Sequence, residues 1–298
     1  MHAHVLTGSP CRHTVPRAAC PLCPQHAEAA RDEAVSDAAA VVAALSAAHA
    51  AGARAVTLRD GDLLARPEAL DLLDAARTMG FAAVELWTGS LSLAQAGMAE
   101  QVAAAGATHV GLPLYGDAAE SHDYVAATPG HFQRTIQALK RTRAAGLRTL
   151  VLAPMLRPTY RNLPQLVQKS VAIDVAGFRF VASPGQDRST NPLLAPLPLT
   201  APYLQTALQR ATAARLRAVM LAVPACVLGT YAAQQLPVPP VFAAIGLQEG
   251  LTPLAPVFVQ GKPCEACTWR LVCPGQLGSL AAQHGWVGLV ARADAPPQ

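Results

Sequence analysis

Cysteines are the residues of this chain whose spacing most directly indicates chemistry. There are seven, in two groups. Cys11, Cys20 and Cys23 lie near the N-terminus with the spacing C-x8-C-x2-C, and the other four lie in the last quarter of the chain: Cys226, Cys264, Cys267 and Cys273. Cysteine thiolates hold iron–sulfur clusters; four thiolates close a cubane, whereas three leave one iron open to another molecule. The division into three and four therefore predicts one reactive cluster and one shielded cluster.

Zinc is the alternative metal for both groups. At the N-terminus a zinc ion would need a fourth protein ligand, which His13 or His26 could supply, and C-x2-C is common to both metals. At the C-terminus only one C-x2-C knuckle is present, beside a C-x5-C spacing, whereas zinc ribbons pair two knuckles. We therefore favour a second iron–sulfur cluster there, and four thiolates would saturate it, which suits electron relay or structural stapling.

Composition narrows the class of protein. The 298 residues are 52% hydrophobic and 14% charged, which is ample for a core and argues against disorder. The net charge is only +4 and the basic residues are scattered, so we expect no nucleic-acid partner. We see no signal peptide and no apolar run of about 18 residues, so we expect a cytoplasmic protein with no membrane contact. In a reducing cytosol clustered cysteines more often bind metal than form disulfides.

The middle of the chain alternates between strand and helix patterns. Helices are predicted over 67–80, 93–105, 132–145 and 163–175, and strands at His4–Thr7, Arg54–Leu58, Phe81–Trp87, Thr108–Leu114, Leu147–Ala153 and Phe178–Val181. Strands alternating with helices predict βα units and a parallel sheet. About six units are too few for a closed eight-stranded barrel. We therefore predict an α/β fold, a partial (β/α)6 TIM-like barrel with a C-terminal cysteine-rich extension.

In such a barrel the functional residues lie in the loops after the carboxyl ends of the strands. That rule gathers five loops at one mouth: Cys11–Cys23, Asp60–Asp62, Thr88–Ser90, Tyr115–Asp123 and Ser183–Gly185. We interpret Trp87, at the end of the strand before Thr88, as a core residue. We interpret His122-Asp123 as a helix start or packing element, although the pair could also act as acid and base.

The chain divides into three parts in this interpretation. The barrel covers residues 1–221, the cysteine-rich extension 222–291, and a disordered tail 292–298. A linker is predicted at Asp187–Pro202, followed by a helix at Tyr203–Arg215 and an apolar strand at Ala218–Val223. The segment from Cys226 to Leu289 has little regular apolar periodicity, so we expect the cysteine site to staple it.

Motifs follow the predicted strands in a recognisable order. Cys11-x8-Cys20-x2-Cys23 follows the first strand, and Asp60-Gly61-Asp62 with Arg66-Pro67-Glu68 follows the second. Thr88-Gly89-Ser90 follows the third strand, Thr128-Pro129-Gly130-His131-Phe132 lies beyond the fourth, and Cys264-x2-Cys267-x5-Cys273-Pro274-Gly275 lies near the C-terminus. In these motifs, and over most of its length, the chain resembles the radical S-adenosylmethionine (radical SAM) superfamily.

The resemblance implies cofactors and roles for these residues. Cys11, Cys20 and Cys23 would hold a [4Fe-4S] cluster whose open iron binds S-adenosylmethionine. Its reductive cleavage would yield a 5′-deoxyadenosyl radical that acts on a peptide or small-molecule substrate. Four residues, with an acidic side chain for the methionine amino group, would bind the cofactor: Asp60, Gly61, Asp62 and Thr88. An auxiliary cluster segment (SPASM/twitch-like) would be held by Cys226, Cys264, Cys267 and Cys273, and a flavodoxin or ferredoxin would donate electrons.

Several positions depart from the family's pattern. The eight-residue spacer between Cys11 and Cys20 is longer than the usual three, Pro113 stands where many relatives have a serine, and Ala126 where many have an arginine. One alternative is therefore a degenerate, non-catalytic iron–sulfur or zinc-binding relative that binds a peptide or partner. Another is a barrel enzyme with a structural zinc and acid–base chemistry around His122. For Asp60-Gly61-Asp62 the alternative is a plain turn. No residue is assigned as catalytic.

Overall fold

The structure is a computed structural model, and it describes residues 2–7, 37–59, 61–89, 91–182, 193–221, 223–234 and 258–296. Among the predicted loops, Cys11–Cys23, Asp60, Ser90 and Ser183–Gly185 lie outside these residues. Within the described ranges, no helix combines the length and apolar character needed to cross a membrane.

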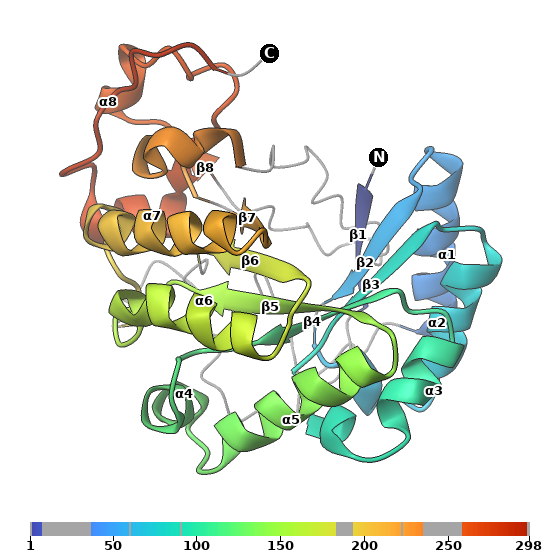
Figure 1. Cartoon of the computed structure of the whole chain (residues 1–298). Coiled ribbons are helices and arrows are strands. Elements are labelled where there is room, and N and C mark those ends of the chain that lie inside the picture. The colour runs from blue at the N-terminus through green and yellow to red at the C-terminus, as the bar shows by residue number, and fades with distance from the viewer. Residues whose placement is uncertain are drawn as a thin grey trace.

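Seven parallel strands form one sheet, and their order in the sheet is their order in the sequence. The strands are β1 (His2–Leu6), β2 (Ala55–Arg59), β3 (Ala83–Trp87), β4 (His109–Pro113), β5 (Arg148–Pro154), β6 (Gly177–Val181) and β7 (Arg217–Leu221). Each strand is therefore followed by a crossover to its neighbour, which is the βα repeat that the alternating pattern predicts. The sheet curls into an open half-barrel (Figure 1).

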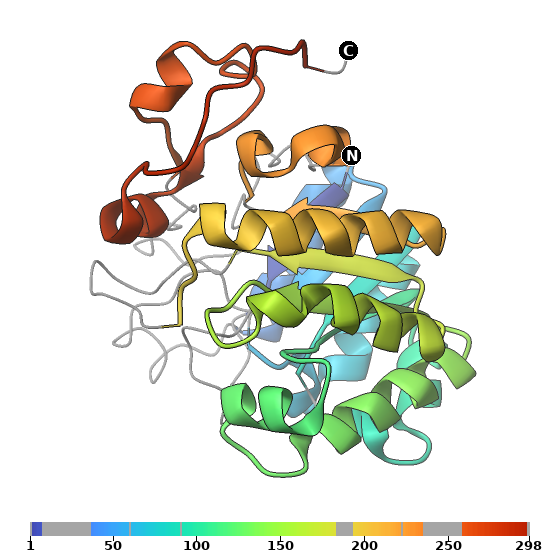
Figure 2. The same cartoon turned by 60° about the vertical axis from the view of Figure 1, so that its left-hand side comes forward.

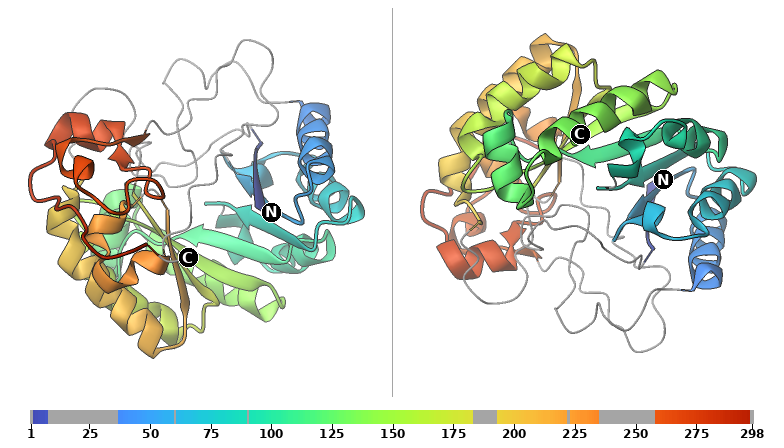
Figure 3. Two further views of the ribbon diagram at one scale, coloured as in Figure 1. Left: turned by 90° about the horizontal axis from the view of Figure 1, so that it is seen from above. Right: turned by 90° about the horizontal axis from the view of Figure 1, so that it is seen from below.

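Helices lie along the convex side of this curled sheet, as the views from above and below show (Figure 3). They are α1 (Ala38–Ala50), α2 (Ala69–Thr78), α3 (Met98–Ala104), α5 (His131–Ala144), α6 (Leu163–Ala172) and α7 (Leu197–Ala213). The helix α4 (Ala119–Ala126) differs, because its Val125 and Ala126 are buried with Trp87 and Leu152 of the opposite face. Alternate strand residues such as Val84, Leu86, Phe178 and Phe180 are buried in the main core. The other face carries polar residues on β1, β2 and β3 and the apolar Trp87 and Leu152, because side chains alternate across a strand.

The fold class predicted from the sequence is confirmed: the chain forms a partial, TIM-like α/β barrel. The predicted apolar strand Ala218–Val223 corresponds to β7 and adds a seventh strand to the six that we counted. The prediction of a linker through Pro202 was wrong for its last residues, because α7 already begins at Leu197. Pro198 stands in the first turn of α7, where its missing N–H has no helical partner to lose.

The C-terminal extension is a small layer of short elements beside the start of α7 (Figure 2). It contains β8 (Phe258–Val259), α8 (Lys262–Glu265), β9 (Gln276–Leu277) and α9 (Gly278–His284), and β8 pairs with β9 in antiparallel fashion. Trp269, Leu277, Leu280 and Leu289 are buried in the same core as the barrel residues. The extension is therefore packed on the barrel through a shared core, and the predicted boundary at residue 221 stays a prediction.

The described residues at the end of the chain contact the extension, and the predicted disordered tail at 292–298 stays a prediction. Arg292 and Asp294 form hydrogen bonds to the extension, including one from the Trp269 indole Nε1 to the Asp294 carbonyl at 3.0 Å. Side-chain and backbone contacts of this kind fix the chain path as far as Asp294, which composition alone did not indicate.

Candidate functional site

The loops after β1, β2 and β3 meet at the carboxyl edge of the sheet. The described residues of these loops that belong to the predicted site or its immediate flank include Thr7, Gly61, Asp62 and Thr88. Of the predicted cofactor-binding residues, Gly61, Asp62 and Thr88 are described, whereas Asp60 lies outside the described residues, as do Cys11, Cys20 and Cys23. The N-terminal cysteine trio therefore stays a prediction, and its anchor on the barrel is Thr7, whose N–H donates to the Arg59 carbonyl at 2.8 Å.

Gly61 and Asp62 do more than make a turn. Gly61 has φ +72°, in the left-handed region that favours glycine, which explains why a glycine stands between the two aspartates. Asp62 precedes the 3₁₀ turn η3 (Leu63–Ala65) but makes no side-chain cap hydrogen bond to it. Its carboxyl group instead reaches the loop after β3 and accepts a hydrogen bond from the Thr88 hydroxyl at 2.6 Å.

Thr88 is completely buried and fixed from two sides. Its N–H donates to the Gly111 carbonyl of β4 at 3.1 Å, and its hydroxyl donates to Asp62. The structure thus brings together two of the predicted site residues, which are 26 positions apart in the sequence. Their hydrogen bond sets the position of a buried carboxyl group at the mouth of the barrel.

Arg66 fixes the point at which the chain leaves β1. The Arg66 side chain is buried, and its Nη1 donates to the Thr7 carbonyl at 3.0 Å. Arg66 therefore holds Thr7, the last described residue before the segment that carries Cys11. Arg66 is the arginine of the Arg66-Pro67-Glu68 motif, so the motif has a structural role here.

Polar residues on the concave face of the sheet were missed by the sequence analysis. Glu85 of β3 accepts a hydrogen bond from Arg179 of β6 at 3.3 Å and another from the Trp87 indole Nε1 at 2.5 Å. The Arg59 guanidinium lies over the Trp87 ring, 4.4 Å from its centroid. A signal was available: polar residues alternate with apolar ones in HAHVL, AVTLR and AVELW, which is the period of a strand with one polar face.

The predicted roles of Trp87 and of His122-Asp123 are those that the structure shows. Trp87 is buried in an apolar cluster with Tyr115, Ala126 and Leu152. Asp123 caps α5, because its carboxyl oxygens accept from the N–H groups of Gly130 and Phe132, both at 2.7 Å. His122 is a buried packing residue.

His122 is held neutral by its surroundings. Its Nδ1 accepts a hydrogen bond from the Tyr115 N–H at 3.2 Å, and its Nε2 lies 2.8 Å from Nδ1 of His131. Burial, followed by the neighbouring His131, lowers the pKa of His122 to about 3. A base with so low a pKa is poorly matched to general acid–base chemistry near neutral pH. The arrangement therefore gives no support to acid–base catalysis by His122.

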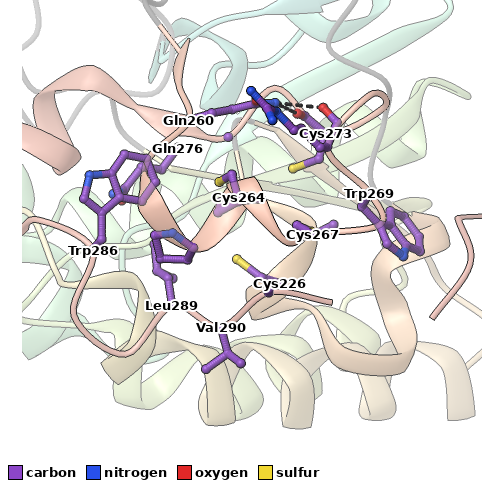
Figure 4. A pocket seen from close by; sticks show the side chains of 16 residues that line it. Cys226, Gln260, Cys264, Cys267, Trp269, Cys273, Gln276, Trp286, Leu289 and Val290 are labelled. Carbon is purple, nitrogen blue, oxygen red and sulfur yellow. Dashed lines mark hydrogen bonds between the residues drawn. The ribbon is translucent and has the colours of Figure 1, made fainter. Parts of the chain in front are cut away.

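The C-terminal cysteines line one pocket (Figure 4). Cys226 lies on the short 3₁₀ turn η6 (Ala225–Val227), Cys264 lies on α8, and Cys267 and Cys273 follow in the loop before β9. All four are free and partly buried. The pocket is otherwise mainly apolar, with Trp269, Trp286 and Leu289 in its wall. The structure therefore brings together the predicted quartet, including Cys226, which lies far from the other three in sequence.

Local features of the extension fix the cysteine loop. The Gln260 side-chain Nε2 donates to the carbonyls of Arg270 and Cys273, both at 2.8 Å. Gly275 has φ +94°, and a Cβ there would lie 2.0 Å from the Val259 carbonyl oxygen. The Pro274-Gly275 pair after Cys273 therefore reflects a backbone turn that only glycine fits.

The thiols of the quartet influence one another. Burial, followed by the neighbouring Cys273 and Cys264, raises the pKa of the Cys226 thiol to about 12. Across the described ranges, no three His, Cys, Asp or Glu side chains converge closely enough to hold a single metal ion. The four thiols surround a pocket rather than a point.

Solved structures with the same fold are known. SuiB from Streptococcus suis bound to S-adenosylmethionine is 13% identical, with a TM-score of 0.56 over 74% of this chain and 46% of SuiB. SuiB bound to the precursor peptide SuiA is 14% identical, with a TM-score of 0.57 over 74% and 48% of the two chains. Native anSMEcpe with bound S-adenosylmethionine is 14% identical, with a TM-score of 0.55 over 74% and 64%.

The chain thus spans about half the length of SuiB and less than two thirds of anSMEcpe. No protein-family model matches the chain, and no curated protein is significantly similar to it in sequence. At these identities the likeness concerns the fold. The chain has the partial-barrel fold of these S-adenosylmethionine-bound proteins, as its resemblance to the radical SAM superfamily predicts.

Proposed function

We propose that the chain is a radical S-adenosylmethionine enzyme. The observation that carries the proposal is its fold, which it shares, at TM-scores of 0.55 to 0.57, with proteins solved with S-adenosylmethionine or peptide bound. In such a barrel ligands bind at the carboxyl ends of the strands, which is where the Asp62–Thr88 pair lies. Cys11, Cys20 and Cys23, which follow β1, would hold a [4Fe-4S] cluster at the same edge.

The residues of the mouth have properties that suit this cofactor. A buried carboxyl group is a good partner for a positively charged amino group, so Asp62 would bind the methionine ammonium of S-adenosylmethionine. Thr88 would orient that carboxyl through its hydrogen bond, and Asp60 and Gly61 would shape the loop around it. With both groups bound, the reduced cluster would give one electron to S-adenosylmethionine, and cleavage of a carbon–sulfur bond would supply methionine and a 5′-deoxyadenosyl radical.

The C-terminal quartet would hold an auxiliary [4Fe-4S] cluster in a SPASM/twitch-like segment. Four thiols line the pocket, and no His, Asp or Glu side chain is among its lining residues. Four thiolates are the ligand set of a saturated cubane. A single zinc ion would draw its thiolates to about 2.3 Å from one point. The single C-x2-C knuckle beside a C-x5-C spacing, where zinc ribbons pair two knuckles, supports the cluster over zinc.

A peptide is the substrate class that we favour, and a small molecule is the alternative. The support comes from the structural neighbours, since SuiB was solved with the precursor peptide SuiA and anSMEcpe with a peptide named Kp18Cys. An electron donor such as a flavodoxin or ferredoxin would reduce the clusters. A reducing compartment such as the cytoplasm would keep the cysteines available for metal.

Reductive cleavage of S-adenosylmethionine tests the proposal. Protein reconstituted anaerobically should contain about eight irons per chain, the sum of two four-iron clusters. With dithionite as reductant it should convert S-adenosylmethionine to 5′-deoxyadenosine and methionine, measured by chromatography and mass spectrometry. The Cys20→Ala, Cys23→Ala double variant should lose this activity together with about half the iron. Full iron without cleavage would overturn the proposal.

One observation favours a second candidate, a non-catalytic relative that binds metal and a peptide or partner. Ala126, at the position where many relatives have an arginine, is buried in the apolar cluster around Trp87 and Leu152. Pro113, where many have a serine, ends β4 and offers no hydroxyl. This candidate predicts bound metal, no cleavage, and a peptide or partner interaction that survives Asp62→Ala.

A further inference from the structure

Arg292 contacts both parts of the cysteine quartet. On the barrel side its Nη1 donates to the carbonyls of Ala225 and Gly229, at 3.1 and 2.7 Å. These carbonyls flank Cys226 in the two short 3₁₀ turns that follow β7. A guanidinium that binds one carbonyl of each turn restrains both turns and, with them, the direction of the cysteine between them.

On the extension side the contacts of Arg292 reach the loop of Cys267. The Arg292 N–H donates to Cys267 Sγ at 3.5 Å, and the Arg292 carbonyl accepts from both the N–H and the hydroxyl of Thr268 at 3.0 Å. The side chain also lies over the Trp269 ring, 4.7 Å from its centroid. One residue thus joins the turn of Cys226 to the segment that carries the other three cysteines.

Asp294 holds the Arg292 side chain in this position. Its carboxyl oxygens accept hydrogen bonds from Arg292 Nε, at 2.8 Å, and from Nη2. Its carbonyl accepts from the Trp269 indole Nε1 at 3.0 Å. The guanidinium is therefore aligned by a carboxylate, a ring and two carbonyls.

From these contacts we propose that Arg292 is a positioning residue for the auxiliary cluster. It holds Cys226 in place beside Cys264, Cys267 and Cys273, and it raises the reduction potential of the cluster that they hold. The inference rests on the proposed function. Hydrogen bonds to cluster sulfurs and nearby positive charge favour the reduced, more negative cluster. Arg292 contributes both: its backbone N–H donates to Cys267 Sγ, and its guanidinium offsets the negative charge of Asp294. A substitution of the side chain removes only the guanidinium, so the expected change in potential comes from the charge alone.

A chain with a single cluster isolates the effect. In the background Cys11→Ala, Cys20→Ala, Cys23→Ala, about four irons should remain, and none of the readouts depends on cleavage of S-adenosylmethionine. Adding Arg292→Ala should make the cluster lose iron to a chelator several-fold faster. It should also move the midpoint potential, followed by electron paramagnetic resonance, to a more negative value.

Two further variants separate positioning from general effects. Arg292→Lys keeps the charge but loses the several hydrogen-bond donors of the planar guanidinium. It should retain a measurable cluster, with an intermediate rate of iron loss and a smaller change in midpoint potential. Lys262→Ala removes a positive charge from an exposed residue of the same extension and should behave like the parent. In the apo-protein, amides of residues 264–273 should exchange hydrogen faster in Arg292→Ala than in Lys262→Ala.

The outcomes distinguish this inference from the proposed function. If Arg292→Ala matches Lys262→Ala in iron loss, potential and hydrogen exchange, Arg292 is not a positioning residue. If the single-site background binds zinc in place of iron, the auxiliary cluster of the proposed function and the effect on potential are both wrong. Faster metal loss and faster exchange in Arg292→Ala would then still support the positioning role.

Discussion

The Thr88 hydroxyl donates to the Asp62 carboxyl group at 2.6 Å and thereby joins the loops that follow β2 and β3. Both residues are buried, so neither group exchanges freely with water. A hydrogen bond to a buried carboxyl group restricts its orientation more strongly than a hydrogen bond at the surface does. Thr88 therefore decides where the acidic group of the mouth points.

Replacing Thr88 by valine removes this hydrogen bond while keeping the shape of the side chain. We expect Thr88→Val to bind S-adenosylmethionine about 10- to 100-fold more weakly, because a hydrogen bond to a charged group contributes roughly 1.5–3 kcal/mol. Isothermal titration of the reconstituted protein under anaerobic conditions measures the affinity. Thr206→Val is the matched control, since Thr206 is exposed on α7 and its hydroxyl bonds only to the Pro202 carbonyl of the same helix. Equal affinities in the two variants would contradict the role given to Thr88.

Cys226 should react slowly with alkylating reagents in the apo-protein. Its pKa of about 12 leaves little thiolate at pH 8, and the thiolate is the reactive form. Compared with the same residue in urea, where a pKa near 8.5 is expected, alkylation in the folded chain should be about one to two orders of magnitude slower. Mass spectrometry of the Cys226 peptide after timed treatment with iodoacetamide measures the rate, and the Cys264 peptide in the same digest reports on the reagent. Similar Cys226 rates in folded and unfolded protein would show that the thiol is not buried as the structure has it.

Much of the fold could be predicted from the sequence because the βα repeat is local. Strand positions lie within one or two residues of their predicted places, for example Leu147–Ala153 against Arg148–Pro154. The cysteine quartet could also be predicted, since three of its members lie close together in the sequence. Cys226 required an inference over a long stretch of chain, and the pocket brings it to the others.

The errors have physical causes. The start of α7 was missed because prolines suggest a linker, although Pro198 is tolerated in a first turn. The Glu85–Arg179 pair was missed because it joins β3 to β6 across the concave face, and no local pattern fixes such a pairing. The contacts of Arg292 with Cys267 and Ala225 were missed for the same reason, since these partners lie 25 and 67 residues away.

The Glu85–Arg179 pair should matter for stability. Its side chains are 5% and 14% exposed, so Arg179→Met would leave Glu85 charged and buried. We expect the free energy of unfolding of the apo-protein to fall by about 3 kcal/mol, in the range found when one partner of a buried pair is removed. Adding Glu85→Gln should recover part of this loss. Urea unfolding of the three proteins gives the values.

The matched control for this pair is an exposed one. Arg143 and Asp174 are 54% and 69% exposed, so Arg143→Met should change the free energy of unfolding by no more than about 1 kcal/mol. If Arg179→Met and Arg143→Met have equal effects, the concave-face pair is not buried as the structure shows.

His122 should make the protein sensitive to acid. Its Nδ1 accepts from the Tyr115 N–H, so the neutral ring carries its proton on Nε2, facing His131. A second proton would have to sit on Nδ1, opposite the Tyr115 donor. The folded-state pKa is about 3, against about 6.5 when the chain is unfolded. Below pH 6.5 the unfolded chain therefore binds a proton that the folded chain does not. The free energy of unfolding then decreases as the pH is lowered.

The expected size is up to about 1.4 kcal/mol for each pH unit between about 6.5 and 3. Urea unfolding at pH 7, 6 and 5 should show a shallower decline for His122→Gln than for the wild type, even where the variant is less stable at pH 7. Burial also lowers the pKa of His4, so His4 contributes a loss of stability of the same sign. Part of the decline should therefore remain in His122→Gln. Parallel pH curves for the two proteins would mean that His122 takes up its proton in the folded state and that the Tyr115 N–H does not bind Nδ1.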